Sequence, residues 1–187
     1  SNDDGVVSLE FSTIVSNTSL LDGGGFYVYG IGGKRNSIVI ENSIVAGNRQ
    51  ISSGLMVISG DDVDCSEFNS TITYGGNSLF GEDTGCDSTI SGDIFIDPAK
   101  IFTLVLEQLA DNGGPKTPDG SNLTHALQMG QGAARHFFSP ALNAAANMFC
   151  PATDQIGTER PVGWSCDIGA IESLFGFNYF FPMIAED

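Results

Sequence analysis

The sequence predicts an all-β solenoid, a fold in which the chain winds through short strands and each turn stacks on the one before it. The first observation is composition. The 187 residues include 24 glycines, and short apolar runs alternate with turn residues, which is typical of tightly turned β structure. The second observation is an internal repeat, because STIVSN (12–17) recurs 31 residues later as SIVAGN (43–48). A repeat of that period indicates stacked structural units.

The repeat also aligns polar residues, and among them it predicts that the asparagines stack on one another. Ser12 matches Ser43 and Asn17 matches Asn48, and NSLFGE (77–82) is a fainter third copy. Asparagines at matching turns can hydrogen-bond with the copies above and below them, as stacked polar ladders do. We therefore expect bonded asparagines and turns of unequal length.

The first strand is predicted over residues 6–12, where Val7, Leu9 and Phe11 alternate with polar residues. The chain enters this strand almost at once, so the first coil would be open, with unpaired backbone groups. Such an edge invites pairing with another chain unless it is covered. Either residues preceded Ser1 in the parent protein, or something packs on this end.

Further strands follow along the chain. Residues 23–37 contain a turn, a short aromatic strand and a second turn, and IVIENSIVAG (38–47) is the best strand pair in the sequence. Leu55–Ser59 is another short apolar run, and SGDIFIDP (91–98) is one more strand, ended by Pro98. The segment SPALNAAANMF (139–149) is the best helix candidate, because a serine can cap it and a proline stands at its first helical position.

Two segments before that helix are less regular. KIFTLVLEQLA (100–110) fits either a helix or strands, and LTHAL (123–127) is a short strand. His125 lies in this strand, and no serine or cysteine nucleophile arrangement surrounds it. A hydrogen-bonded structural histidine is therefore the favoured interpretation.

The chain has four cysteines: Cys65, Cys86, Cys150 and Cys166. Four cysteines allow three complete pairings, and their order favours the two local pairs, Cys65–Cys86 and Cys150–Cys166. Zinc is the alternative, but no CxxC occurs and neither His125 nor His136 falls within a ligand cluster. Two disulfides indicate an oxidising compartment. The start, SNDDG, lacks the segments of a signal peptide, and no apolar run is long enough to span a membrane.

The charge is strongly negative, with a formal net charge of −16 and a pI near 4.1. Nucleic acid and anionic membranes would repel such a surface, so neither is an expected partner. Three acids in four residues, Asp61, Asp62 and Asp64, are calcium candidates, because calcium takes oxygen ligands. Their spacing is not that of an EF-hand, and a solvated acidic turn is favoured. No cofactor is expected, with calcium left open.

The C-terminal region carries a family resemblance. DQIGTERPVGWSCDIGAIE (154–172) resembles the ending of bacterial extracellular proteins built on right-handed parallel β-helix repeats with a choice-of-anchor type C-terminal region. The similarity extends through LADNGGPKTPDGSNLTHAL (109–127), NSIVAGN (42–48) and residues 62–86. It departs at SPALNAAAN (139–147), where a SPAIDAG-like run is usual, and IFTLVLEQL is longer than expected.

The resemblance implies a fold and a setting. The fold is an all-β, right-handed parallel β-helix with a disulfide-stapled C-terminal cap, to which our sequence interpretation adds the short helix. The setting is the extracellular space or the cell surface, and no settled activity follows. In the family, residues 100–110 belong to the last coils, so strand and loop are favoured there.

The cap is predicted over residues 150–172, where a disulfide would close a short loop and IGAIE (168–172) alternates as a half-buried strand does. Its charged residues are Asp154, Arg160, Asp167 and Glu172. They could form a site, but the favoured interpretation is a structural cap in which Arg160 pairs with Asp167 or Glu172, since structural ion pairs also cluster charges.

Residues 173–187 form the aromatic tail, with Phe175, Phe177, Tyr179, Phe180 and Phe181. Soluble monomers avoid exposing such a patch, so the tail either folds back, docks on a neighbouring subunit or anchors the protein. We divide the chain into β-helix coils and late loops (1–149), the cap (150–172) and the tail (173–187).

These observations predict a non-enzymatic extracellular structural or adhesion module. It would assemble head-to-tail into a surface filament through Val7, Leu9 and Phe11 of the open coil and the aromatic tail. Expected partners are copies of itself or other cell-surface components, with glycans as a further candidate. The alternative is a polysaccharide-binding or -cleaving β-helix of the lyase or hydrolase kind, although no catalytic residues are recognised.

Overall fold

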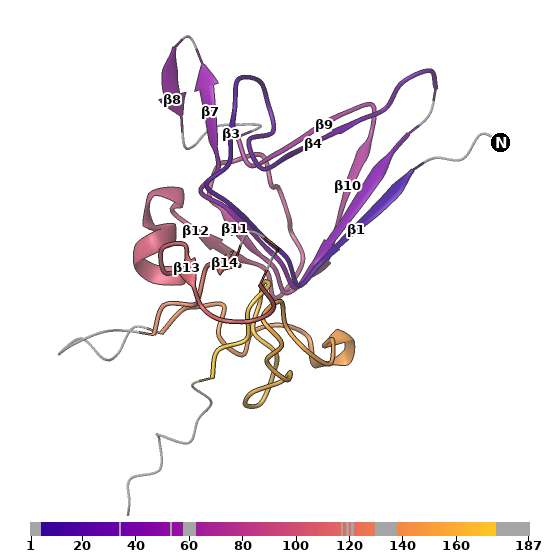
Figure 1. Ribbon diagram of the computed structural model, residues 1–187. Coiled ribbons are helices and arrows are strands. Elements are labelled where there is room, and N and C mark those ends of the chain that lie inside the picture. The colour runs from indigo at the N-terminus through magenta and orange to yellow at the C-terminus, as the bar shows by residue number, and fades with distance from the viewer. Residues whose placement is uncertain are drawn as a thin grey trace, which may run out of the picture.

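The computed structural model describes residues 5–33, 35–52, 54–57, 63–116, 118, 120, 122–129 and 138–174. Strands predominate over helix in this part of the chain, and most of the paired strands are parallel (Figure 1). The fold is therefore β-rich with parallel sheets, as predicted.

The first sheet joins three strands that are far apart in sequence. They are β1 (Val6–Glu10), β5 (Ser37–Glu41) and β10 (Thr71–Gly76), in the order β1-β5-β10, with both pairs parallel. Val7 lies opposite Ile38, and Ile38 lies opposite Ile72. Each time the chain returns, it therefore places its strand beside the preceding strand and in register with it.

The second sheet has the order β12-β11-β6-β2 and is also parallel. Its strands are β2 (Thr13–Val15), β6 (Ile44–Ala46), β11 (Leu79–Gly81) and β12 (Ile94–Ile96). Thr13 and Leu79 both lie opposite Ile44, so the three sequence copies lie side by side in the predicted register. Matched serines are 31 residues apart between the first two copies and 35 between the next two, which confirms unequal turns.

Smaller sheets complete the β structure. In these, β3 pairs parallel with β7 and β7 pairs antiparallel with β8, β4 pairs parallel with β9, and β13 pairs antiparallel with β14. We call the three successive segments that lie side by side the first (6–29), second (37–68) and third (71–81) passages. The bounds are β3 (Thr18–Ser19), β4 (Phe26–Tyr29), β7 (Arg49–Ser52), β8 (Leu55–Val57), β9 (Cys65–Phe68), β13 (Ala110–Asp111) and β14 (Leu123–Thr124).

The second sheet separates two hydrophobic cores. Neighbouring residues of a strand face opposite sides, and Ile44 and Val45 of β6 belong to different cores. The interior core contains Ile38, Ile40, Val45, Cys65, Phe80 and Cys86. The outer core contains Ile44 and Leu79 together with residues of the C-terminal half, among them Val105, Leu106, Ala141 and Ile168. The C-terminal half therefore covers the outer face of the second sheet, as Figure 1 shows below the strands.

The predicted helix over residues 139–149 is wrong. Turns occupy this segment, and helix is confined to the 3-10 turn η4 (Asn147–Phe149). The backbone is committed elsewhere, because three of its N–H groups donate to distant acceptors: Asn143 to Asp167, Ala145 to Cys166 and Ala146 to Asn42. Tertiary hydrogen bonds have overridden the helix propensity of the alanines.

Residues 100–110 also differ from the favoured strand and loop. A 3-10 turn, η1 (Pro98–Lys100), leads into a π-helical turn, η2 (Ile101–Val105), in which the Leu106 N–H donates to the Ile101 carbonyl. The Asp97 carboxylate caps η1 by accepting the Ala99 N–H. The helical turn is stabilised because it buries Ile101 and Val105 in the outer core.

The segment IGAIE (168–172) is not a strand. The chain bends at Gly169, whose φ is 99°, and its N–H donates to the Asn42 carbonyl. A Cβ at this glycine would lie 2.8 Å from Thr13 Oγ1 and 2.9 Å from Ile44 Cδ1. Close approach to the second sheet therefore sets the local conformation. The short strand predicted in LTHAL is present as β14.

Candidate functional site

A column of serines runs across the three passages, and we call it the serine column (Ser12, Ser43, Ser78 and Asp93). The Ser12 N–H donates to Ser43 Oγ at 3.1 Å, and the Ser43 N–H donates to Ser78 Oγ at 3.2 Å. The Ser78 N–H then donates to Asp93 Oδ1 at 2.7 Å. Each hydroxyl also donates to the carbonyl two residues before it.

The asparagine column (Asn17, Asn48 and Asp64) follows the same rule. The backbone N–H and Nδ2 of Asn17 donate to Asn48 Oδ1 at 3.1 and 3.0 Å. Those of Asn48 donate to Asp64 Oδ1 at 2.9 and 2.7 Å. The predicted bonding of Asn17 to Asn48 is therefore confirmed.

Asp64 is not part of a solvated acidic turn, and that interpretation was wrong for this residue. Its side chain is buried beside Asn48, and burial raises the pKa of its carboxyl group. Asp61 and Asp62 lie outside the described residues, so the calcium hypothesis stays untested there. In the part of the chain that is described, no group of three or more histidine, cysteine, aspartate or glutamate residues could hold a metal ion.

Both columns run in one direction. In each column the backbone N–H of one member donates to the side chain of the next. The serine column runs through all three passages to Asp93, and the asparagine column runs from the first passage into the second, where it ends at Asp64. Ser12 and Asn17 stand at the start. Among the described residues, none donates a hydrogen bond to Ser12 Oγ or Asn17 Oδ1. Ser43 Oγ and Asn48 Oδ1 in the second passage therefore accept hydrogen bonds, whereas the equivalent atoms of the first passage, Ser12 Oγ and Asn17 Oδ1, accept none from the described residues.

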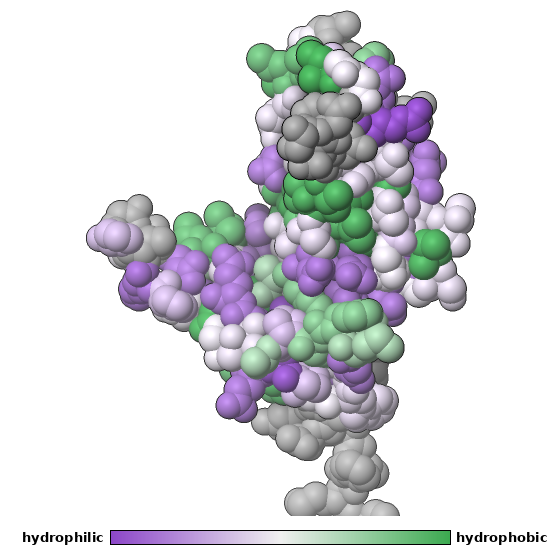
Figure 2. Space-filling view, turned by 90° about the vertical axis from the view of Figure 1, so that its right-hand side faces the viewer, coloured by the Kyte–Doolittle hydropathy of each residue, from purple (hydrophilic) through white to green (hydrophobic). Residues whose placement is uncertain are grey.

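The first passage also forms the edge of every sheet that it enters, because β1, β2, β3 and β4 are all terminal strands. Exposed apolar side chains follow this edge: Val6, Val7, Leu20, Leu21 and Ile31. Seen from the β1 side, the surface carries apolar patches bordered by polar residues (Figure 2). An open edge of this kind is a template for a further strand.

The three assembly residues predicted in this region differ in exposure. Val7 is 59% exposed, whereas Leu9 and Phe11 are half-buried. Phe11 lies just beyond β1 with a φ of 45°, and its counterparts Asn42 and Asn77 have φ values of 51° and 53°. Asparagine tolerates this left-handed region, whereas a bulky residue is a strained exception.

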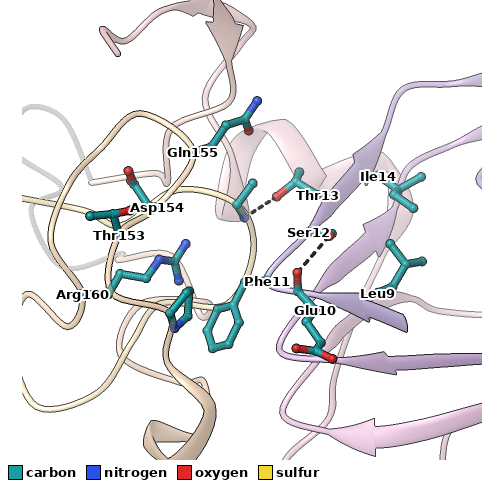
Figure 3. Close-up of a pocket in the computed structure, with 12 residues that line it drawn as sticks. Leu9, Glu10, Phe11, Ser12, Thr13, Ile14, Thr153, Asp154, Gln155 and Arg160 are labelled. Carbon is teal, nitrogen blue, oxygen red and sulfur yellow. Dashed lines mark hydrogen bonds between the residues drawn. The ribbon is translucent and has the colours of Figure 1, made fainter. Parts of the chain in front are cut away.

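A contact from the cap accompanies the strained residue. The Arg160 guanidinium lies 4.9 Å from the centre of the Phe11 ring, a distance that favours a cation–π interaction. Figure 3 shows Arg160 approaching Phe11 from the cap side. The Ala170 N–H also donates to Thr13 Oγ1 at 3.0 Å. The cap therefore packs against the first passage.

Two hollows lie between the first passage and the C-terminal half. The larger, about 550 Å³, is lined by Leu9–Ile14 on one side and by Thr153, Asp154, Gln155 and Arg160 on the other (Figure 3). The smaller, about 380 Å³, brings Thr13 and Val15–Asn17 together with Ala170 and Ile171. The cap therefore ends next to the open side of β2.

The charged residues of the cap form a buried network. Arg160 Nη1 lies 3.5 Å from Glu172 Oε2, with both side chains almost fully buried. Arg160 also donates to the backbone carbonyls of Asp167 and Gly169 at 3.0 and 2.7 Å. Of the two expected partners, the ion pair is thus with Glu172, and Asp167 is bonded through its backbone.

The three carboxylates of this network are occupied by backbone N–H groups. Asp154 accepts from Ile156, Thr158 and Glu172; Asp167 accepts from Asn143 and Ser173; and Glu172 accepts from Val162 and Asp167. These bonds fix the path of the loop, which fits the structural interpretation of the cap. Burial raises the pKa of Asp167 to about 7 and also raises the pKa of Glu172.

The remaining predicted residues can be placed as follows. Both disulfides are present, Cys65–Cys86 and Cys150–Cys166, in the pairs that the chain order favoured. His125 Nδ1 lies 2.8 Å from the Glu107 carbonyl oxygen, and its ring packs against Phe102. His136 and the tail residues Phe175, Phe177, Tyr179, Phe180 and Phe181 lie outside the described residues.

Sequence reasoning missed two features of this region. The aspartates that end the columns do not stand at repeat positions, and the contact between Arg160 and Phe11 joins segments with no shared pattern.

Among the residues that the structure describes, no helix has the length and apolar character needed to cross a membrane. No protein-family model matches the chain, and a search of curated proteins found no match.

Proposed function

We propose that this chain is a right-handed parallel β-helix that serves as a non-enzymatic extracellular structural or adhesion module. In this proposal it assembles head-to-tail into a surface fibre, with the first passage of one copy joined to the aromatic tail of the next. The parallel registers of the first and second sheets support the solenoid. The two disulfides fit an oxidising compartment.

The observation that carries the proposal is the open first passage. Its four strands are sheet edges, its exposed apolar residues have no described cover, and two column acceptors receive no hydrogen bond from a described residue. Unpaired strand edges bind further strands by β-augmentation. A tail bound to this edge makes a heterologous contact, and such contacts propagate when the rotation does not close.

Deletion of residues 174–187 tests the proposal. The truncated protein should lose assembly, measured by light scattering and negative-stain electron microscopy, while its circular dichroism spectrum stays that of the parent protein. A matched control is Met148→Ser, which removes an exposed apolar side chain on η4 (82% exposed). If the truncated protein assembles as the parent does, the proposal is refuted.

Binding of a polysaccharide is the second candidate, favoured by a row of exposed aromatic rings on β4 and β9. Tyr27 and Tyr29 have ring centres 6.1 Å apart, Tyr29 and Phe68 are 5.5 Å apart, and all three are about half exposed. Exposed rings can pack against the apolar faces of sugar units. Glycan-array binding that is lost in Tyr29→Ala but kept in Trp164→Ala would favour this candidate, and absence of glycan binding by the parent would remove it.

A further inference from the structure

The aromatic tail repeats a strand of the fold. The tetrapeptide SLFG occurs at residues 78–81 and again at 173–176, and in its first occurrence it forms β11 together with Ser78 of the serine column. The second occurrence is followed by Phe177 and Asn178. Ser173 and Asn178 thus have the spacing that joins Ser12 to Asn17. The segment combines the strand sequence of the third passage with the asparagine of the first two.

The open side of β2 has the hydrogen-bonding groups that such a segment requires. The carbonyls of Ser12 and Ile14 accept from the second passage, from Ile44 N–H and Asn48 Nδ2. Neighbouring residues of a parallel strand direct their backbone N–H and C=O groups to opposite sides. The backbone groups of Thr13 and Val15 therefore face the open side of β2. Asn17 Oδ1 also faces no described donor, whereas Asn48 Oδ1 accepts two hydrogen bonds.

The apolar residues of the segment also fit this position. In β11, Leu79 lies in the outer core and Phe80 in the interior core. A strand in the same register would place Leu174 towards the outer core and Phe175 over the interior core. There Leu9 and Ile14 are only partly buried, so Phe175 would cover the open end of the interior core.

We propose that residues 174–178 of one copy add as a parallel strand to β2 of a neighbouring copy, with Asn178 opposite Asn17. This inference rests on the proposed head-to-tail assembly and gives it a register. The Ser173 N–H donates to the Asp167 carboxylate of its own cap, so the added strand begins at Leu174. Leu174 is 73% exposed, so this residue does not pack on Val15 of its own copy.

The proposed pairing of Asn178 with Asn17 also predicts which residue lies opposite Tyr179 in the neighbouring copy. If Asn178 lies opposite Asn17, then Tyr179 lies opposite Thr18, and adjacent parallel strands place Cα atoms about 4.8 Å apart, within disulfide range. Among the described residues, the parent protein has no free cysteine. Mixing Thr18→Cys protein with Tyr179→Cys protein under mild oxidation should therefore give a covalent dimer. Thr71→Cys, an exposed threonine at the start of β10, is the matched control and should give none.

The results of this cross-linking experiment distinguish the proposed strand register from the proposed head-to-tail assembly. A dimer with Thr18→Cys but not with Thr71→Cys supports both. If the double variant Thr18→Cys/Tyr179→Cys forms only an intrachain disulfide, the strand belongs to its own copy, and both the neighbour and the assembly are overturned. Assembly seen by light scattering without the Thr18 cross-link refutes the register and leaves the proposed function standing. Monomers without a cross-link refute both.

A substitution within the asparagine pair supplies a second measurement. Asn178→Ala would remove one side-chain hydrogen bond, worth about 1 kcal/mol, from the contact with Asn17. Assembly should then weaken about fivefold to tenfold, while Asn143→Ala, in the turn segment that precedes the cap, should leave the concentration dependence of assembly unchanged. Equal effects of the two substitutions would contradict the pairing.

Discussion

Removal of the Asn48 side chain should strongly destabilise the fold. Asn48 is fully buried in the middle of the asparagine column, and its amide makes four hydrogen bonds: two accepted from Asn17, one donated to the Ile14 carbonyl and one donated to Asp64. A net hydrogen bond contributes about 1 kcal/mol, and one to a charged group about 1.5–3 kcal/mol. Because the bonds from Asn17 are partly exposed, we expect Asn48→Ala to lower the free energy of unfolding by about 4 kcal/mol.

Asn17→Ala is the matched control, because Asn17 is exposed and its side chain makes a single hydrogen bond within the column. The expected loss is about 1 kcal/mol or less. Urea unfolding with intact disulfides, followed by circular dichroism, measures both values. Equal losses for the two variants, or a loss below about 1 kcal/mol for Asn48→Ala, would show that the columns do not stabilise the passages.

Three further predictions concern the cap. Burial raises the pKa of Asp167 to about 7, above its unfolded value near 3.9. The associated stability is therefore full below about pH 4 and lost as pH rises through 7, and Asp167→Asn should flatten the fall in Tm between pH 5 and pH 8. Arg160→Ala would leave buried Glu172 unpaired, which should lower the free energy of unfolding by about 3–5 kcal/mol in urea melts; a loss within error would contradict this. Gly169→Ala should lower Tm more than Gly157→Ala, because both have positive φ but only Gly169 approaches Thr13 and Ile44; similar changes would refute the close packing.

The sequence predicts the repeating part of the fold because stacking in register requires the same residue at the same position. Asn17 and Asn48 are bonded as their spacing indicated, and the matching Ser12 and Ser43 are bonded as well. The repeat does not predict the position of Asp64. It enters the asparagine column from the segment before β9, 16 residues after Asn48, and therefore stands at no repeat position.

Local sequence signals gave a wrong secondary structure where residues distant in the sequence form hydrogen bonds with the backbone N–H groups. Residues 139–149 contain alanines, a capping serine and a proline, all of which favour a helix. The Asp167 carboxylate nevertheless accepts the Asn143 N–H, and Asn42 accepts that of Ala146. The cap shows the same limit, because nothing in its sequence specifies that Arg160 meets Phe11 or that Ala170 meets Thr13.

The chemistry of the columns gives the protein two unlike ends. A serine or asparagine accepts a hydrogen bond at its side chain and donates its backbone N–H to the next passage, so it can continue a column. An ionised aspartate can accept at its side chain but has no side-chain donor, so only its backbone N–H could continue the column. The backbone N–H groups of Asp64 and Asp93 donate to Thr84 and Ile90 instead.

Each column therefore ends at its aspartate, and no described residue donates to Ser12 Oγ or Asn17 Oδ1 at its other end. A strand that donates N–H groups completes the first passage without disturbing any existing bond, whereas a strand added beyond Asp64 finds no column donor. If the module assembles, growth follows this polarity, with the first passage as the receiving end. Asn17→Asp should then keep the acceptor and preserve assembly, whereas Asn17→Leu should weaken assembly at least about fivefold to tenfold, as expected for Asn178→Ala.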